Sequence, residues 1–139
     1  MINLVKGNLK KIGVTLGNKL DSSLNLKVNK KCIPSKYYID PADHLCVKRY
    51  QPLSYMHHGL YLGLGLVIHY DFKQICIVTL EDFAKGERIY LMDSEVTYPK
   101  AVVMARAASR LGEEKYHLMV NNCEHFVRWC RNGKDINLR

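Results

Sequence analysis

The chain has 139 residues and a mass of 16.0 kDa, with 47% hydrophobic and 24% charged residues. This composition is typical of one compact globular domain and excludes a chain that is disordered throughout. The sequence contains no apolar run of about 18 residues, so no membrane-spanning helix is expected. The formal net charge of +8 either keeps the chain soluble or attracts anionic partners such as lipid headgroups, nucleic acid or acidic proteins.

Residues 1–40 are predicted to form a basic arm that precedes a globular domain over residues 41–139. The arm holds eight lysines and only two acidic residues. Apolar residues recur in it at helical spacing, at Val5, Leu9, Ile12, Leu16 and Leu20. We therefore expect residues 1–20 to form an amphipathic helix that contacts a membrane surface or a partner, or that packs on the domain. Nucleic-acid binding is not expected, because the sequence has no helix-turn-helix or RNA-binding signature.

The five cysteines are predicted to be free thiols. Their number is odd, and none of their spacings is the Cys-x-x-Cys of a common zinc site. The first residues show no secretory signal, so the chain is expected to be cytoplasmic, with contact to a membrane surface through the arm. Neither a metal ion nor another cofactor is expected.

The pattern of apolar residues, glycines and prolines predicts the order of elements along the chain. These elements are a polar connector (21–42), a strand (43–49), a β-hairpin bent at 63–65 (57–70), a third strand (74–80), a fourth strand (89–92), a helix ended by Gly112 (101–111), and a last helix ended by Gly133 (123–131). This order predicts an α+β domain in which helices pack on a small antiparallel β-meander.

Cys123 is the candidate nucleophile. It follows Asn122, a preferred N-cap residue, so its thiol would lie at the positive end of a helix dipole, which lowers the pKa of a thiol. The residues at 123, 126, 127 and 130 form an apolar stripe, which directs this thiol toward the sheet. The alternative is an inert buried cysteine, an interpretation that also fits the other cysteines, Cys32, Cys46, Cys76 and Cys130.

The predicted hairpin supplies the matching base. A three-residue loop at 63–65 pairs Gly59 with His69 and sets His57 opposite Asp71. His57 and His69 then share one face of the sheet as diagonal neighbours, within about 7–8 Å, while His58 lies on the opposite face. If the Cys123 helix packs on the shared face, the three side chains form a Cys-His-His nucleophile site.

Two sequence motifs resemble a known family. Residues 57–63 read HHGLYLG and are followed by His69, and residues 121–130 read NNCEHFVRWC. These motifs resemble the lecithin:retinol acyltransferase-like family, also called the H-box/NC family, and the chain looks closest to its bacterial members. The resemblance covers about residues 41–133. It implies a circularly permuted relative of the NlpC-type papain-like fold and makes residues 41–139 the catalytic domain.

The resemblance also implies chemistry. It implies that Cys123 is the nucleophile, that His57 is its base and that His69 orients His57. Tyr55 matches a tyrosine near the acyl site, where it could bind the oxyanion, although the backbone N–H of Cys123 could do the same. Asp71 is the alternative orienting residue. The implied reaction takes an acyl chain from a glycerophospholipid as a cysteine thioester and passes it to an alcohol, an amine or water.

Two other functions stay open at this point. A cysteine peptidase or amidase begins with the same thiolate attack on an acyl carbon and needs the same base. A non-catalytic interaction module is the third candidate, because the resembling family includes viral proteins that act through host interaction. The chain also departs from the family at Leu64, where a polar Asp or Asn is usual, and no membrane helix of the kind that follows the domain in animal members is expected.

Overall fold

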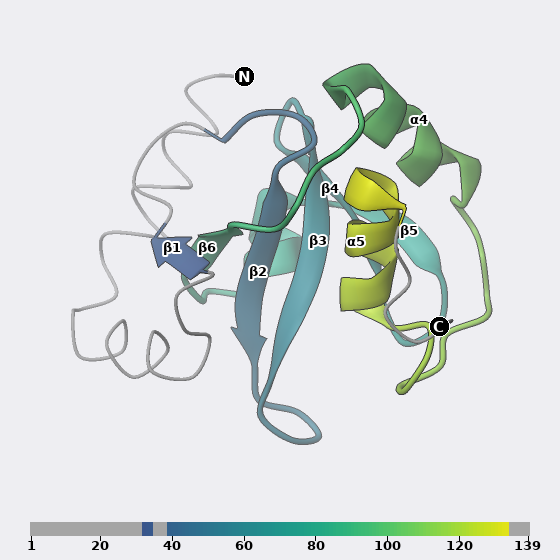
Figure 1. The fold of residues 1–139 in the computed structure, drawn as a ribbon. Coiled ribbons are helices and arrows are strands. Elements are labelled where there is room, and N and C mark those ends of the chain that lie inside the picture. The colour runs from purple at the N-terminus through teal and green to yellow at the C-terminus, as the bar shows by residue number, and fades with distance from the viewer. Residues whose placement is uncertain (1–31, 35–38, 134–139) are drawn as a thin grey trace.

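The computed structural model describes residues 32–34 and 39–133, and the helix expected within residues 1–20 lies outside these ranges. In chain order its strands and helices are β1 (Cys32–Pro34), β2 (His44–Arg49), β3 (Tyr55–Gly63), β4 (Leu66–Tyr70), β5 (Ile75–Thr79), α3 (Leu80–Ala84), β6 (Ile89–Met92), α4 (Lys100–Ser109) and α5 (Cys123–Asn132) (Figure 1). The strands form one antiparallel sheet in the order β1-β6-β2-β3-β4-β5, which confirms the predicted α+β class.

The topology of the sheet differs from the prediction in three places. Strands β2 to β5 form the expected meander, but β6 returns to pair with β2 rather than continuing beyond β5. The predicted connector contains β1, which pairs with β6 at the edge of the sheet. Helix α3 was not predicted: it follows β5 directly, and the side chain of Thr79 caps it by accepting a hydrogen bond from Asp82 N at 3.1 Å.

The central hairpin has the predicted register except beside its turn. Gly59 pairs with His69 and Leu60 with Ile68 as predicted. The predicted three-residue loop is wrong, because Gly63 rather than Leu62 pairs with Leu66 and the register shifts between Tyr61 and Gly63. Leu64 sits at the tip of this turn with a φ of 55°, in the left-handed region that Asn and Asp adopt more readily than Leu. Its side chain is exposed, so the unusual residue places no apolar group against the turn itself.

Two different layers cover the two faces of the sheet. On one face, Val67 and Leu45 pack against Phe83 of α3. On the other face, Leu60 and Ile68 pack against α4 and α5. Phe126 of α5 belongs to this core, and Figure 1 shows α5 running alongside β3. Successive residues of β3 therefore contribute alternately to two separate cores.

The face chosen by α5 contradicts the sequence-based expectation. The helix packs on the face that carries Leu60 and His58, whereas His57 lies on the α3 face together with His69 and Phe83. Both faces of the hairpin carry residues that can be buried, Tyr61 and Val67 on one and Leu60 and Ile68 on the other, so the alternation of residues alone did not say which layer would cover which face. The assumption that Cys123 approaches the shared face of His57 and His69 is wrong.

Gly59 fixes the position of α3 beneath the sheet. A Cβ atom at this position would lie 2.7 Å from Cε1 of Phe83 and 2.7 Å from Cγ1 of Val67. The fully buried Phe83 ring occupies that space and contacts His57, with 5.6 Å between the ring centroids. The missing side chain of Gly59 thus lets Phe83 support the histidine above it.

We predict that Gly59→Ala lowers the free energy of unfolding by about 1–3 kcal/mol, because the added methyl group overpacks the contact with Phe83. Urea denaturation of purified protein measures this change. Combining Gly59→Ala with Phe83→Leu should cost less than the sum of the two single variants, since the smaller side chain makes room. Strict additivity of the two losses would contradict the proposed contact.

Candidate functional site

The start of α5 is held by reciprocal capping. The side chain of Asn122 accepts hydrogen bonds from the backbone N–H groups of Glu124 at 3.0 Å and His125 at 3.1 Å. In return, Nδ1 of His125 accepts a hydrogen bond from Asn122 N at 3.1 Å. Phe126 then anchors the helix in the core. Four residues of the NCEHF motif therefore act to fix the backbone that carries Cys123.

Cys123 is buried, with 5% of its surface exposed, and its thiol points inward as predicted. Burial raises the pKa of this thiol to about 11, and the hydrogen bonds from the backbone N–H groups of His58 and Glu124 only partly oppose the rise. The expectation of a lowered pKa is therefore wrong for the free protein, because desolvation outweighs the helix dipole. A neutral thiol of this kind needs a base to become a nucleophile.

His57 and His69 form a directly bonded pair. Nε2 of His57 lies 2.6 Å from Nδ1 of His69, and both side chains are buried. Burial lowers the pKa of His57 to about 2 and that of His69 to about 4, and the nearby Arg49 contributes to both shifts. Both rings are therefore neutral near pH 7. The bond to His69 engages Nε2 of His57, so Nδ1 is the ring nitrogen that could accept a proton.

A second histidine pair lies on the opposite face of β3. Nδ1 of His58 lies 2.8 Å from Nε2 of His44, and Nδ1 of His44 lies 2.8 Å from Oγ of Ser94. Nε2 of His58 faces Oε1 of Glu124 at 3.7 Å, and Glu124 in turn pairs with Arg128. The sequence analysis assigned no role to His44 or Ser94. The register of β2 against β3 would have shown that His44 lies near His58, because Cys46 pairs with His58 and places His44 one diagonal step away.

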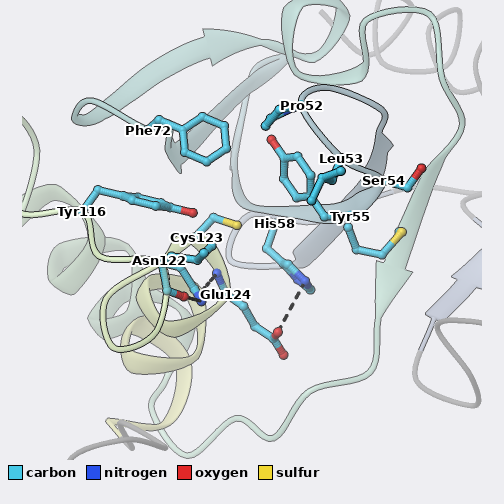
Figure 2. Close-up of a pocket in the computed structure, with 12 residues that line it drawn as sticks. Pro52, Leu53, Ser54, Tyr55, His58, Phe72, Tyr116, Asn122, Cys123 and Glu124 are labelled. Carbon is cyan, nitrogen blue, oxygen red and sulfur yellow. Dashed lines mark hydrogen bonds and ion pairs between the residues drawn. The ribbon is translucent and has the colours of Figure 1, made fainter.

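Cys123 opens onto a cavity of about 380 Å³. Figure 2 shows the sulfur of Cys123 beside Tyr116, while the imidazole of His58 points away from that sulfur toward Glu124. The residues that line the cavity are mostly apolar or aromatic: Pro52, Leu53, Ser54, Tyr55, Met56, His58, Phe72, Tyr116, Leu118, Asn122, Cys123 and Glu124. A cavity of this size and character suits a hydrocarbon chain.

His57 and His69 line a neighbouring cavity of about 390 Å³. Tyr55 and Phe72 line both cavities, and their rings lie edge to face with 5.9 Å between centroids. The ring of Tyr55 also lies 6.2 Å from that of His57. The predicted site residues thus occupy two adjoining cavities, with Cys123 in one, the His57–His69 pair in the other, and Tyr55 in the wall between them.

Asp71 is held by its own turn rather than by His57. Its Oδ1 atom accepts hydrogen bonds from the backbone N–H groups of Lys73 and Gln74, both at 2.7 Å, and Oδ2 accepts one from the thiol of Cys76 at 3.4 Å. The bonded partner of His57 is His69, not Asp71. This geometry favours His69 over Asp71 as the residue that orients His57.

The mouth of the Cys123 cavity carries exposed apolar side chains. Leu53 is 76% exposed and Leu118 is 68% exposed, and both also line the cavity. Met119, beside Leu118, is 69% exposed. Within residues 32–34 and 39–133, no helix has the length and apolar character needed to cross a membrane.

The chain is similar in sequence to enzymes that act on acyl groups. Human lecithin retinol acyltransferase is 36% identical over 80 residues, which cover 54% of this chain and 34% of the relative. The rat protein of the same name is 40% identical over 67 residues, covering 45% and 29%. Human phospholipase A and acyltransferase 1 is 28% identical over 128 residues, covering 76% of each chain.

The chain matches only about a third of the length of the lecithin retinol acyltransferases. The sequence model of the family named lecithin retinol acyltransferase, however, matches residues 37–136, which include both motifs, both histidine pairs and the whole of α5. Because this match spans most of its residues, the chain belongs to the lecithin retinol acyltransferase family.

Proposed function

We propose that the protein is a thiol-dependent acyltransferase or phospholipase A-type hydrolase that acts on glycerophospholipid. The observation that carries this proposal is the position of Cys123, at a capped helix start that opens onto an apolar cavity. The names of the relatives, an acyltransferase and a phospholipase A, support the same class of reaction. The proposed catalytic residues are Cys123 as nucleophile, His57 as base and His69 as the orienting residue.

His57 is a better base than His58, although His58 lines the same cavity as Cys123. Nδ1 of His58 is bonded to His44, its Nε2 faces the Glu124 carboxylate at 3.7 Å, and its ring points away from the sulfur (Figure 2). His57 has only Nε2 engaged. The thiol also lies against the backbone N–H of His58, which belongs to the peptide group that joins His57 to His58. The proposed proton transfer requires the His57 ring and the thiol to meet at Tyr55, which lines both cavities.

The proposed reaction has two steps. Nδ1 of His57 takes the proton of Cys123, the sulfur attacks the ester carbonyl carbon, and the same proton passes to the departing lysophospholipid oxygen, leaving an acyl thioester. An alcohol, an amine or water then attacks the thioester and returns a proton through His57 to the sulfur. The backbone N–H of Cys123 at the helix start supports the oxyanion, and Tyr55 is the second donor at the cavity wall.

The exposed leucines at the cavity mouth support a lipid surface as the source of the substrate. Leu53 and Leu118 lie on separate loops, yet both line the cavity of Cys123. Apolar side chains that surround an active-site entrance can enter the acyl boundary of a bilayer and let a single phospholipid slide toward the nucleophile. The basic arm of residues 1–20 stays a separate proposal for the same surface.

We predict that incubation with phosphatidylcholine vesicles leaves an acyl group on Cys123, detected by intact mass and peptide mapping. His57→Gln should reduce release of fatty acid by roughly a hundredfold or more, since it removes the base. His58→Gln should retain most of the activity, because His58 is not the base.

The matched pair of variants decides between the two histidines, provided circular dichroism shows that both are folded. Inactive His58→Gln beside active His57→Gln would assign the base to the second pair. An adduct that forms only with an amide or peptide substrate would identify a peptidase or amidase instead.

We predict that alkylation of Cys123 by iodoacetamide accelerates about tenfold per pH unit between pH 7 and 9, because the pKa of about 11 leaves only a small thiolate fraction in this range. Mass spectrometry resolves Cys123 from the fully buried Cys130, which serves as the control. A rate that is already constant at pH 7 would mean that the thiolate forms in the free protein, contrary to the effect of burial.

We predict that Leu53→Ser combined with Leu118→Ser reduces co-sedimentation with neutral phosphatidylcholine vesicles. Neutral lipid isolates the apolar contribution from that of the lysine-rich arm. Leu111→Ser is the matched control, because Leu111 is also exposed, at 52%, but does not line the cavity. If the double variant and Leu111→Ser lose co-sedimentation equally, a membrane contact at the cavity mouth is contradicted. Deletion of residues 1–20, tested on anionic vesicles at low and high salt, examines the arm independently.

A further inference from the structure

Three side chains with metal-binding atoms lie together beside the His57–His69 pair. His69 on β4 pairs directly with Cys76 on β5, and Asp71 follows His69 by two residues. One nitrogen, one sulfur and one carboxylate oxygen from these three residues all lie within 4.8 Å of one another. The register of the β4–β5 hairpin therefore sets the positions of His69 and Cys76, and Asp71 lies in the turn that joins these strands.

Asp71 is held in position for such a role. Its Oδ1 atom is fixed by the backbone N–H groups of Lys73 and Gln74, which leaves Oδ2 turned toward the thiol of Cys76. His69 and Asp71 also line the 390 Å³ cavity, which gives an ion a route from solvent. Ligand atoms around a tetrahedral zinc ion lie about 3.5 Å apart, so a contraction of about 1 Å would complete the set.

We propose that His69, Asp71 and Cys76 form an inhibitory site for a thiophilic divalent metal ion such as Zn²⁺. A nitrogen, a carboxylate oxygen and a thiolate are zinc ligands, and three of them leave the fourth position open to water from the cavity. On binding, the thiol of Cys76 gives up its proton to solvent and the sulfur bonds the metal. Arg49 and Lys85 line the same cavity and their charge opposes any divalent cation, so the bonds to the thiolate and the imidazole must carry the affinity, which favours Zn²⁺ over a hard cation such as Mg²⁺.

The inhibitory effect rests on the proposed function, in which His57 is the base and His69 orients it. If the metal binds Nε2 of His69, then Nδ1 of His69 keeps its hydrogen and donates it to Nε2 of His57. The neutral His57 ring must then carry its own hydrogen on Nδ1, the atom that should accept the proton of Cys123. If the metal binds Nδ1 of His69 instead, it displaces His57. Either mode disables the base.

Cobalt(II) tests the site directly, without an activity measurement. Titration of the full chain with Co²⁺ should produce the d–d bands of a tetrahedral site and a near-ultraviolet sulfur-to-cobalt charge-transfer band. The same spectrum should appear with Cys123→Ser, which removes the nucleophile. Cys76→Ser should abolish the charge-transfer band, and Cys76→Ser or Asp71→Asn should weaken Zn²⁺ binding in calorimetry by about tenfold or more. Loss of the band in Cys123→Ser but not in Cys76→Ser would overturn the proposal.

The activity measurement tests the inhibition separately. For each variant, fatty-acid release with Zn²⁺ is divided by the release from the same variant with a chelator. We expect a ratio well below one for the unchanged protein, whose activity should return when the chelator is added to the zinc-treated sample. For Cys76→Ser at the same zinc concentration we expect a ratio near one. Metal binding with unaltered activity would overturn the inhibitory role. Spectral binding in a protein that shows no activity under any condition would contradict the proposed function and leave the metal site standing.

Discussion

Strand β3 places consecutive histidines on opposite faces of the sheet, and each is held there by a second buried histidine. His57 bonds His69 from β4, and His58 bonds His44 from β2. Because all four rings are withdrawn from water, each pair stays neutral and has only a few ways to share its hydrogens. The hydrogen bonds within these pairs form only if β2 and β4 keep their registers against β3. The buried histidines and the strand pairing therefore depend on each other.

The two pairs have different surroundings and therefore different capacities. The pair on the α5 face is bonded to Ser94 through His44, and Nε2 of His58 faces the carboxylate of Glu124, on the nucleophile helix, at 3.7 Å. The pair on the α3 face rests on the Phe83 ring and opens into a cavity. We interpret the His44–His58 pair as a network that positions the start of α5. We interpret the His57–His69 pair as the one that can accept a proton, at Nδ1 of His57.

Turn and capping residues in the sequence predicted the hairpin and the last helix, but nothing in the sequence indicated which elements pack against each other. The loop at 63–65 predicted the partner of Gly59 but not the pairing beside the turn, and the caps Asn122 and Gly133 bound the last helix within one residue of its predicted end. The face on which α5 packs could not be predicted from β3, since both of its faces are buried against a layer of helix. The cluster around Cys76 escaped a search that considered only spacings between cysteines, because two of its residues come from paired strands and the third, Asp71, from the turn between them.

The shared wall between the two cavities has a consequence for how the site can change. Tyr55 and Phe72 line both the cavity of Cys123 and that of His57. A smaller residue at either position would enlarge the cavity of Cys123 and would also remove part of the wall that keeps water from the His57–His69 pair. The space for a substrate and the exclusion of water from the histidines therefore change together. Substitutions at Tyr55 and Phe72 should therefore widen the range of accepted substrates and at the same time weaken the control over where the hydrogens of the His57–His69 pair reside. Directed evolution toward larger substrates would encounter this conflict first at these two rings.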